Sequence, residues 1–351
     1  MARCAGLTRR VAPHNPPLNG GGGRVADSWH TGQSGGVNPV DSATHALARG
    51  FRRLVSGDPD GQPEWVEQLE HGSDIGYFGP GSATWDVHGS LPTLVGGIRA
   101  LLVQALHPAA LAGVQEHSRY ENDALGRLAG TTQWLTVVTF GDRAQADREC
   151  ARVRGLHRKV KGTYDDDGVQ APYSAMDPDL LRWVHVAFTD SFLATHRVWG
   201  GPIRGGADEY VREWATAGEL VGVVDPPRSV AELEEQLADF DSVLRRTPAS
   251  DRTVSFVRNA PLPLPARGPY AVLFAGAVST LPAHYRSLLG LPPVPSVLAR
   301  PAVGALLGAM GAVLGRQSPS QRNARRRAAR MDAWTSPSPG PRLGIATGRR
   351  R

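Results

Sequence analysis

The chain has 351 residues, 41% of them hydrophobic, which is enough apolar material for one large domain or two of ordinary size. Its formal net charge of +6 comes from its ends: ten arginines and one acid, Asp332, lie between Arg316 and Arg351, and four arginines and no acid precede Asp27. The rest of the chain is acidic overall, which argues against a nucleic-acid-binding face on the folded body.

The N-terminal segment carries no sign of a fold or of an export signal. Residues 1–41 are rich in glycine, proline and polar residues, and we expect them to be disordered. The pair Arg9 and Arg10 precedes "VAPHNPPLNGGGG" rather than an apolar run, so we expect no signal peptide. The longest apolar run, 301–315, is shorter than the ~20 residues of a membrane-spanning helix. We therefore expect no transmembrane segment and a cytoplasmic protein.

Helix signals dominate the first half of the body. Pro92 stands near the start of the apolar stretch "LVGGIRALLVQAL", and Asp142 can cap a helix that would end at Gly162. The β-branched run "LTVVTF", 135–140, is the one good strand candidate.

Helix signals continue in the second half. Asp177 as N-cap, Pro178 at the first helical position and Gly200 as the stop predict a long helix. The capping box "SVAE", 229–232, predicts a helix that runs to about Arg246. Further helices are expected at 42–55, 208–220, 268–280 and 297–314.

These elements predict an all-α protein with a single domain at 42–315. The segment 316–351, with "RRRAAR" and "SPSPGPR", has the composition of a disordered Arg-rich tail. A solvated basic tail is its simplest interpretation, and a docking function for it stays open.

One histidine stands in the basic octet "GLHRKVKG", 155–162. One face of its helix carries, at steps of four and three, Ala146, Cys150, Val153, His157 and Val160. The basic side chains fall off that face, so the imidazole of His157 is expected to point inward. A buried histidine needs hydrogen-bond partners or a metal, and both a core histidine and a ligand remain open.

The other histidines do not form a metal site by spacing. Neither Glu-x-x-His nor His-Glu-x-x-His occurs in the chain. His185 and His196 share a helix face but lie roughly 16 Å apart along it. A site with several histidines would therefore require convergence of distant segments.

Several segments together resemble a known family. They are "LLVQALHPAALAGVQEHSRYENDALGRLAGTTQWLTVVTFGDRAQA", "VRGLHRKVKG" and "YSAMDPDLLRWVHVAFTDSFL". In content and order they resemble the catalytic domain of bacterial latex-clearing (rubber) oxygenases and of smaller actinobacterial relatives. The resemblance covers about 60–295.

The resemblance implies a mostly helical, globin-like fold that holds a noncovalent haem b. The implied iron ligand matches His157, and the Arg-x-x-x-Thr pair of the family matches Arg127 and Thr131. A haem needs an imidazole that projects from an apolar helix face, and Val153 and Val160 are expected to pack beside the porphyrin.

Arg127 and Thr131 are four residues apart and would share a helix face. The resemblance implies that they are catalytic: an inward arginine can pair with a propionate or polarise dioxygen, and the threonine can hydrogen-bond to the same groups. The alternative for Arg127 is a surface ion pair with Glu121 or Asp123.

One departure from the family pattern concerns the iron. The latex-clearing enzymes have a lysine just before the threonine, and this chain has Gly130 there. His107 and His185 are interpreted as structural, although either could line the cavity. Since no export signal is expected, a small apolar, isoprenoid-like substrate is a better hypothesis than rubber.

The sequence thus favours a haem b-dependent oxygenase that uses dioxygen on a small apolar substrate. Two alternatives stay open. One is a haem-binding or sensor protein without turnover, and the other is a helical interaction module without a cofactor, whose arginine tail binds anionic partners.

Overall fold

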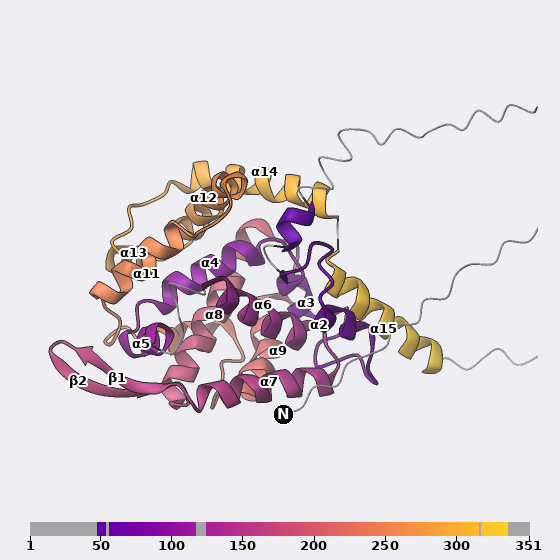
Figure 1. Cartoon of the computed structure of the whole chain (residues 1–351), viewed down its shortest axis with the longest axis horizontal. Helices are drawn as coiled ribbons and strands as arrows, with labels where there is room; N and C mark the ends of the chain where they lie inside the picture. Colours follow the sequence, from indigo (N-terminus) through magenta and orange to yellow (C-terminus); the bar gives the residue numbers. More distant parts are fainter. Residues whose placement is uncertain (1–47, 54–55, 117–123, 316, 336–351) are drawn as a thin grey trace, which may run out of the picture. The chain divides into compact units, whose positions relative to one another are not determined.

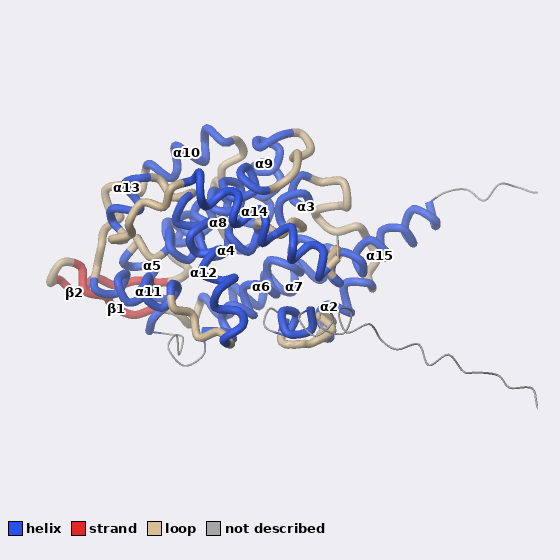
Figure 2. Tube along the Cα trace, turned by 90° about the horizontal axis from the view of Figure 1, so that it is seen from above, coloured by secondary structure: helices blue, strands red, loops and turns tan. Residues whose placement is uncertain are grey.

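The computed structural model describes residues 48–53, 56–116, 124–315 and 317–335, and these are mostly helical (Figures 1 and 2). The all-α prediction is confirmed, while the globin-like arrangement stays a prediction. Residues 48–53 are helical, and the helices that follow are α2 (Glu64–Glu67), η1 (Gln68–Glu70), α3 (Ala83–His88), α4 (Thr93–Gln104), α5 (Pro108–Glu116), α6 (Ala124–Phe140), α7 (Arg143–His157), α8 (Pro178–Trp199), α9 (Gly206–Val221), α10 (Val230–Ala238), α11 (Pro248–Arg258), α12 (Leu264–Ser279), α13 (Ala283–Leu288), α14 (Ser296–Leu314) and α15 (Pro319–Thr335).

Helix α8 lies at the centre of the domain (Figure 2). It forms where the sequence predicts it. The carboxylate of Asp177 accepts hydrogen bonds from the backbone N–H groups of Asp179 and Leu180, Pro178 takes the first helical position, and Gly200 ends the helix.

Helix α4 packs closely against α8 because Gly96 has no side chain. A Cβ there would lie 2.6 Å from Cδ1 of Phe192. The buried guanidinium of Arg99 reaches across the same interface, 2.6 Å from Asp190 and 2.8 Å from the hydroxyl of Ser191. A charge with two such partners is tolerated at a buried helix contact.

The strand predicted at 135–140 is wrong, because these residues complete α6. Val138 is fully buried, and the ring of Phe140 meets Trp85 of α3 edge-on at 4.8 Å. Burial of these side chains in the helical core outweighs the β propensity of the run.

Helix α7 is shorter than predicted. It begins after Asp142 as expected but ends at His157 rather than at Gly162. Val160 therefore lies beyond the helix and not on the face of α7 that the sequence suggested. It packs instead in a small cluster with Ala109, Tyr173 and Leu180.

A hairpin that the sequence analysis missed follows α7. Strands β1 (Lys161–Asp166) and β2 (Val169–Ser174) pair antiparallel. Asp167 (φ 54°) and Gly168 (φ 87°) form the two-residue turn in left-handed conformations, as a type I′ hairpin requires. The Asp-Gly pair was the sequence signal for it.

Helix α10 ends at Ala238, before the predicted Arg246. Helix α14 packs on α12 and α8 through Ala299, Val303 and Leu307, a stripe of every fourth residue. Because it starts at Ser296, it is longer than the apolar run seen in the sequence. It is long and apolar enough to cross a membrane, and 17% of its apolar window is buried.

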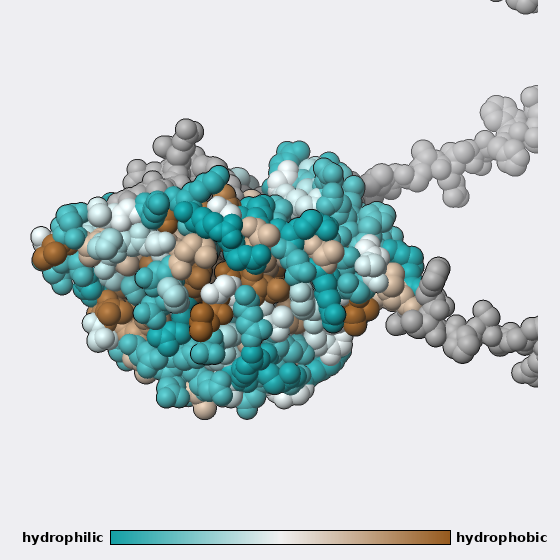
Figure 3. Space-filling model, turned by 90° about the horizontal axis from the view of Figure 1, so that it is seen from below, coloured by the Kyte–Doolittle hydropathy of each residue, from teal (hydrophilic) through white to brown (hydrophobic). Residues whose placement is uncertain are grey.

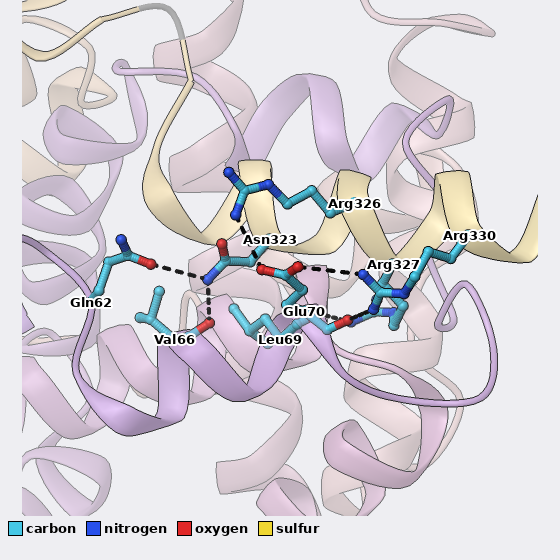
Figure 4. A network of polar contacts seen from close by, with 8 residues as sticks. All are labelled: Gln62, Val66, Leu69, Glu70, Asn323, Arg326, Arg327 and Arg330. Carbon is cyan, nitrogen blue, oxygen red and sulfur yellow. Dashed lines mark hydrogen bonds and ion pairs between the residues drawn. The ribbon is translucent and has the colours of Figure 1, made fainter.

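Helix α15 corrects the domain boundary that we expected. Residues 319–335 were predicted to belong to a disordered tail, but they form a helix that packs on α2, η1 and α6 (Figures 1 and 4). Arg327 is 1% exposed and donates to the carbonyl oxygens of Asp74 (3.0 Å), Leu69 and Phe140 (2.6 Å). These buried hydrogen bonds give the basic segment a fold that composition does not reveal.

Further contacts of α15 complete this network (Figure 4). Asn323 donates to the carbonyl oxygen of Val66 at 2.9 Å, and Arg326 and Arg330 pair with Glu70. Helix α15 is thus fastened along the whole α2–η1 segment. The predicted disordered segment 1–41 and the end of the predicted tail, 336–351, lie outside the described residues.

Candidate functional site

Helices α6 and α7 form an antiparallel pair joined by Gly141 and Asp142. A capping box fixes the connection: Asp142 accepts a hydrogen bond from the backbone N–H of Gln145 at 2.7 Å, and the amide oxygen of Gln145 accepts one from the N–H of Asp142 at 3.0 Å. The two helices therefore diverge from a rigid corner.

The register of the pair follows from a contact near its middle. Trp134 on α6 lies beside the thiol of Cys150 on α7, and burial raises the pKa of that thiol to about 11. Counting back along α6 and forward along α7 at 1.5 Å per residue places Thr131 opposite Val153 and Arg127 opposite His157. By this count, Arg127 and Thr131 lie on the same half of the helix pair as His157, the half away from Gly141 and Asp142.

His157 is the final residue of α7. Its side chain is half-buried and its Nδ1 atom is buried. Val153, one turn earlier, is half-buried as well, whereas Thr131 is exposed. The side chain of Arg127 lies outside the described part of the structure.

Two glycines lie at this end of the helix pair. A Cβ on Gly130 of α6 or on Gly155 of α7 would meet no atom within 4 Å among the described residues. Leu156 is an apolar side chain beside His157 that is 49% exposed. Figure 3 shows a face on which apolar side chains gather near the middle of a mostly hydrophilic surface.

Helix α9 runs beside α7. The ring of Trp214 lies 5.9 Å from that of Trp134, and the guanidinium of Arg154 donates to the carbonyl oxygen of Leu220. Both helices therefore advance in the same direction toward the end that holds His157. Gly218, one turn after Trp214, lies near the level of Val153.

A buried histidine packs against that glycine. His185 of α8 is 6% exposed, and a Cβ on Gly218 would lie 2.8 Å from its Cε1 and 2.9 Å from its Nδ1. Burial lowers the pKa of His185 to about 4, so the ring is neutral at neutral pH. Its Nε2 is buried and has no hydrogen-bond partner among the described residues.

Two other buried histidines lie elsewhere. The Nε2 of His88 is 3.1 Å from the hydroxyl of Tyr210, inside a group of aromatic rings that includes Trp214. His107 lies at the corner between α4 and α5, near the rings of Trp183 and Phe240. The described residues contain no group of three or more His, Cys, Asp or Glu that could hold a metal ion.

A cavity of about 220 Å³ lies along the α6–α7 pair, from Gln145 near its corner to Arg152. Its polar wall includes Glu149, whose carboxylate accepts hydrogen bonds from Nε and Nη2 of Arg152. Its lining comes from α2, η1, α6 and α7, namely Trp65, Gln68, Leu69, Gln133, Val137, Gln145, Arg148, Glu149 and Arg152. None of the residues predicted for the site lines it.

His185 of α8 tests one interpretation made from the sequence. It was interpreted as structural, and its burial agrees with a core position, but an unpartnered ring nitrogen is unusual for a core histidine. The Trp-Val-His block was the available signal. Its meaning depends on Gly218, which is 33 residues away in the chain and which no local pattern connects to it.

Comparison with known proteins agrees with the resemblance seen in the sequence. Searches of curated proteins and of solved structures found no match. A family model described as "ER-bound oxygenase mpaB/B'/Rubber oxygenase, catalytic domain" matches residues 85–314. The matched segment starts in α3 and ends with α14, so it contains α6 to α9 and every residue discussed for the site. The chain therefore belongs to the family of the mpaB and rubber oxygenase catalytic domains, and it is an oxidoreductase of the oxygenase class.

Proposed function

We propose that this protein is a haem b-dependent oxygenase whose iron is held by His157. The observation that supports the proposal is the half-buried His157, with a buried Nδ1 atom, at the end of α7 in a chain of an oxygenase family. A bound haem b would supply a redox-active iron for dioxygen.

The residues at this end fit such a group. His157 is half-buried and its Nδ1 atom is buried, and an imidazole is a residue type that can hold a haem iron. His185 contributes a buried nitrogen that lacks a partner.

The predicted site residues would have separate roles in holding such a haem and its substrates. His157 orients the haem, and Val153 provides an apolar contact on the same helix. Arg127, whose level matches that of His157, pairs with a propionate or with dioxygen, and Thr131 hydrogen-bonds to the same groups. Val160 packs with α5 and the hairpin, so its contact with a haem would come from the loop after α7.

The substrate is a small apolar molecule of isoprenoid type. Leu156, an apolar side chain next to His157 in the sequence, is 49% exposed and offers an apolar contact for such a molecule. Dioxygen is the second substrate.

The test begins with the purified full chain from haem-supplemented cells. It should show a Soret band, and His157→Ala should lose the haem while its far-UV circular dichroism stays unchanged. His284→Ala, which removes a histidine that is 57% exposed, is the matched control and should keep its haem. A colourless wild-type protein would refute the proposal. Haem-bound protein that consumes no oxygen with monoterpene or sesquiterpene alkenes under reducing conditions would favour a non-catalytic haem protein instead.

A further inference from the structure

Helix α14 has an outer face that carries no charged side chain after Arg300. Its inner face packs on α12 and α8. On the outer side, Val297 and Leu298 are 76% and 67% exposed, and every exposed residue of the helix after Arg300 is alanine, glycine or proline. A helix on the surface of a soluble domain normally presents charged and polar side chains to water. An apolar surface of this extent marks a site of interaction.

The packing of α14 decides how it could meet a membrane. The helix is long and apolar enough to cross one, but Val303 is fully buried, Leu307 is 6% exposed, and both belong to the main hydrophobic core. A Cβ on Gly276 of α12 would lie 2.7 Å from Val303, so the two helices pack closely. A spanning orientation would break this contact. Helix α14 runs along the edge of the body, beyond α12, where its outer face can lie flat on a surface (Figure 1).

The charge around α14 has one sign. From Arg252 to Met331 the chain has eleven arginines and no aspartate or glutamate, and this segment supplies α12 to α15 and most of α11. The side chains of Arg258, Arg267 and Arg300 are exposed, and no described carboxylate pairs with them. Basic side chains beside an apolar helix face are the combination with which interfacial helices bind anionic lipids.

Other occupants of this face match it less well. A symmetric contact with a second copy would bring two of these basic segments together, and like charges across an interface oppose association. A nucleic acid would neutralise the arginines but would leave Val297 and Leu298 against phosphate and water. An anionic bilayer satisfies both the apolar side chains and the charge.

We propose that α14 docks this protein on an anionic lipid bilayer, with the helix axis in the plane of the membrane surface. Val297 and Leu298 enter the boundary between the headgroups and the acyl chains, and Arg300 pairs with lipid phosphates. This inference goes beyond the proposed function, since it depends neither on a haem nor on His157.

The experiment measures co-flotation of the full chain with vesicles. One set contains phosphatidylcholine alone, and the other contains equal parts of phosphatidylcholine and phosphatidylglycerol. The protein should bind the mixed vesicles, and high salt should weaken the binding. The double variant Val297→Gln, Leu298→Gln removes apolar area without a change of charge and should lower the affinity about tenfold or more. Arg300→Gln should lower it about fivefold.

Matched variants control for each change. Val169→Gln combined with Val224→Gln removes two apolar side chains that are 67% and 62% exposed elsewhere on the surface. Arg148→Gln removes an exposed arginine of α7. Both controls should float with the mixed vesicles as the wild type does.

Four results would overturn the proposal. They are a wild type that stays free of the mixed vesicles, equal binding to the two kinds of vesicle, equal losses in the α14 and control pairs, and a wild-type dimer in sedimentation that the α14 pair makes monomeric. The last result would assign the face to a second copy. If far-UV circular dichroism shows that the α14 pair does not fold, Leu298→Ala decides, because alanine keeps the helix propensity; unchanged binding of that variant would overturn the proposal.

Discussion

The buried guanidinium of Arg327 gives the sharpest test of how α15 is held. It donates to carbonyl oxygens in three separate segments, at Leu69, Asp74 and Phe140. Arg327→Met keeps most of the length of the side chain but removes all of the donors. The carbonyl oxygens would then remain buried without them, and α15 would lose its main link to η1.

The expected size of the effect follows from these contacts. A hydrogen bond from a charged donor contributes about 1.5–3 kcal/mol, and several to one group are not additive. Burial lowers the pKa of Arg327, which shows that desolvation of the charge opposes part of this gain. We expect Arg327→Met to lower the free energy of unfolding by about 3–5 kcal/mol, and the melting temperature by roughly 6–15 °C.

Urea unfolding followed by far-UV circular dichroism measures the loss. Arg322→Met is the control on the same helix, because Arg322 is exposed and donates only to the nearby carbonyl of Gln317. It should change the stability by less than about 0.5 kcal/mol. Equal stabilities for the two variants would refute the role given to the buried arginine.

Two further predictions concern glycine and pH. Gly218→Ala should lower the free energy of unfolding in urea by about 1–3 kcal/mol, because its Cβ would displace His185. Gly130→Ala should raise it by up to about 1 kcal/mol, since a Cβ there meets no described atom within 4 Å. A Gly130→Ala variant less stable than Gly218→Ala would contradict the packing described for α8 and α9. Burial lowers the pKa of His88 to about 3 and the pKa of His185 to about 4. Below pH ~6.5 the unfolded chain therefore binds protons that the folded chain does not. The free energy of unfolding should fall between pH ~6.5 and ~4 by about 1.4 kcal/mol per pH unit for each residue. Urea unfolding curves at pH 7 and pH 5 measure this fall. A free energy of unfolding that does not change with pH in this window would disprove the prediction, and so would a pH dependence that His88→Gln leaves unchanged.

Local signals predicted the helix starts well. The caps at Asp142 and Asp177 depend on residues within three positions of each other, so the sequence contains all of the information.

Features that depend on distant contacts were not predictable in the same way. The run 135–140 has β-branched residues, yet it is helical because α3 covers it. The basic composition of 319–335 suggested disorder, since nothing nearby indicates that its arginine would donate to carbonyl oxygens about 250 residues away. The close packing of the His185 ring depends likewise on Gly218, a distant residue of α9.

The contact between α15 and the α2–η1 segment also has a meaning for biosynthesis. A ribosome completes residues 62–74 long before it reaches Asn323 and Arg327, and the hydrogen bonds between them span more than 250 positions. Until then the early segment stays hydrated and accessible to proteases and chaperones. A message cut short before codon 319 would still encode the whole region that the oxygenase family model matches. The polypeptide would lack α15, however, and with it the hydrogen bonds to the α2–η1 segment.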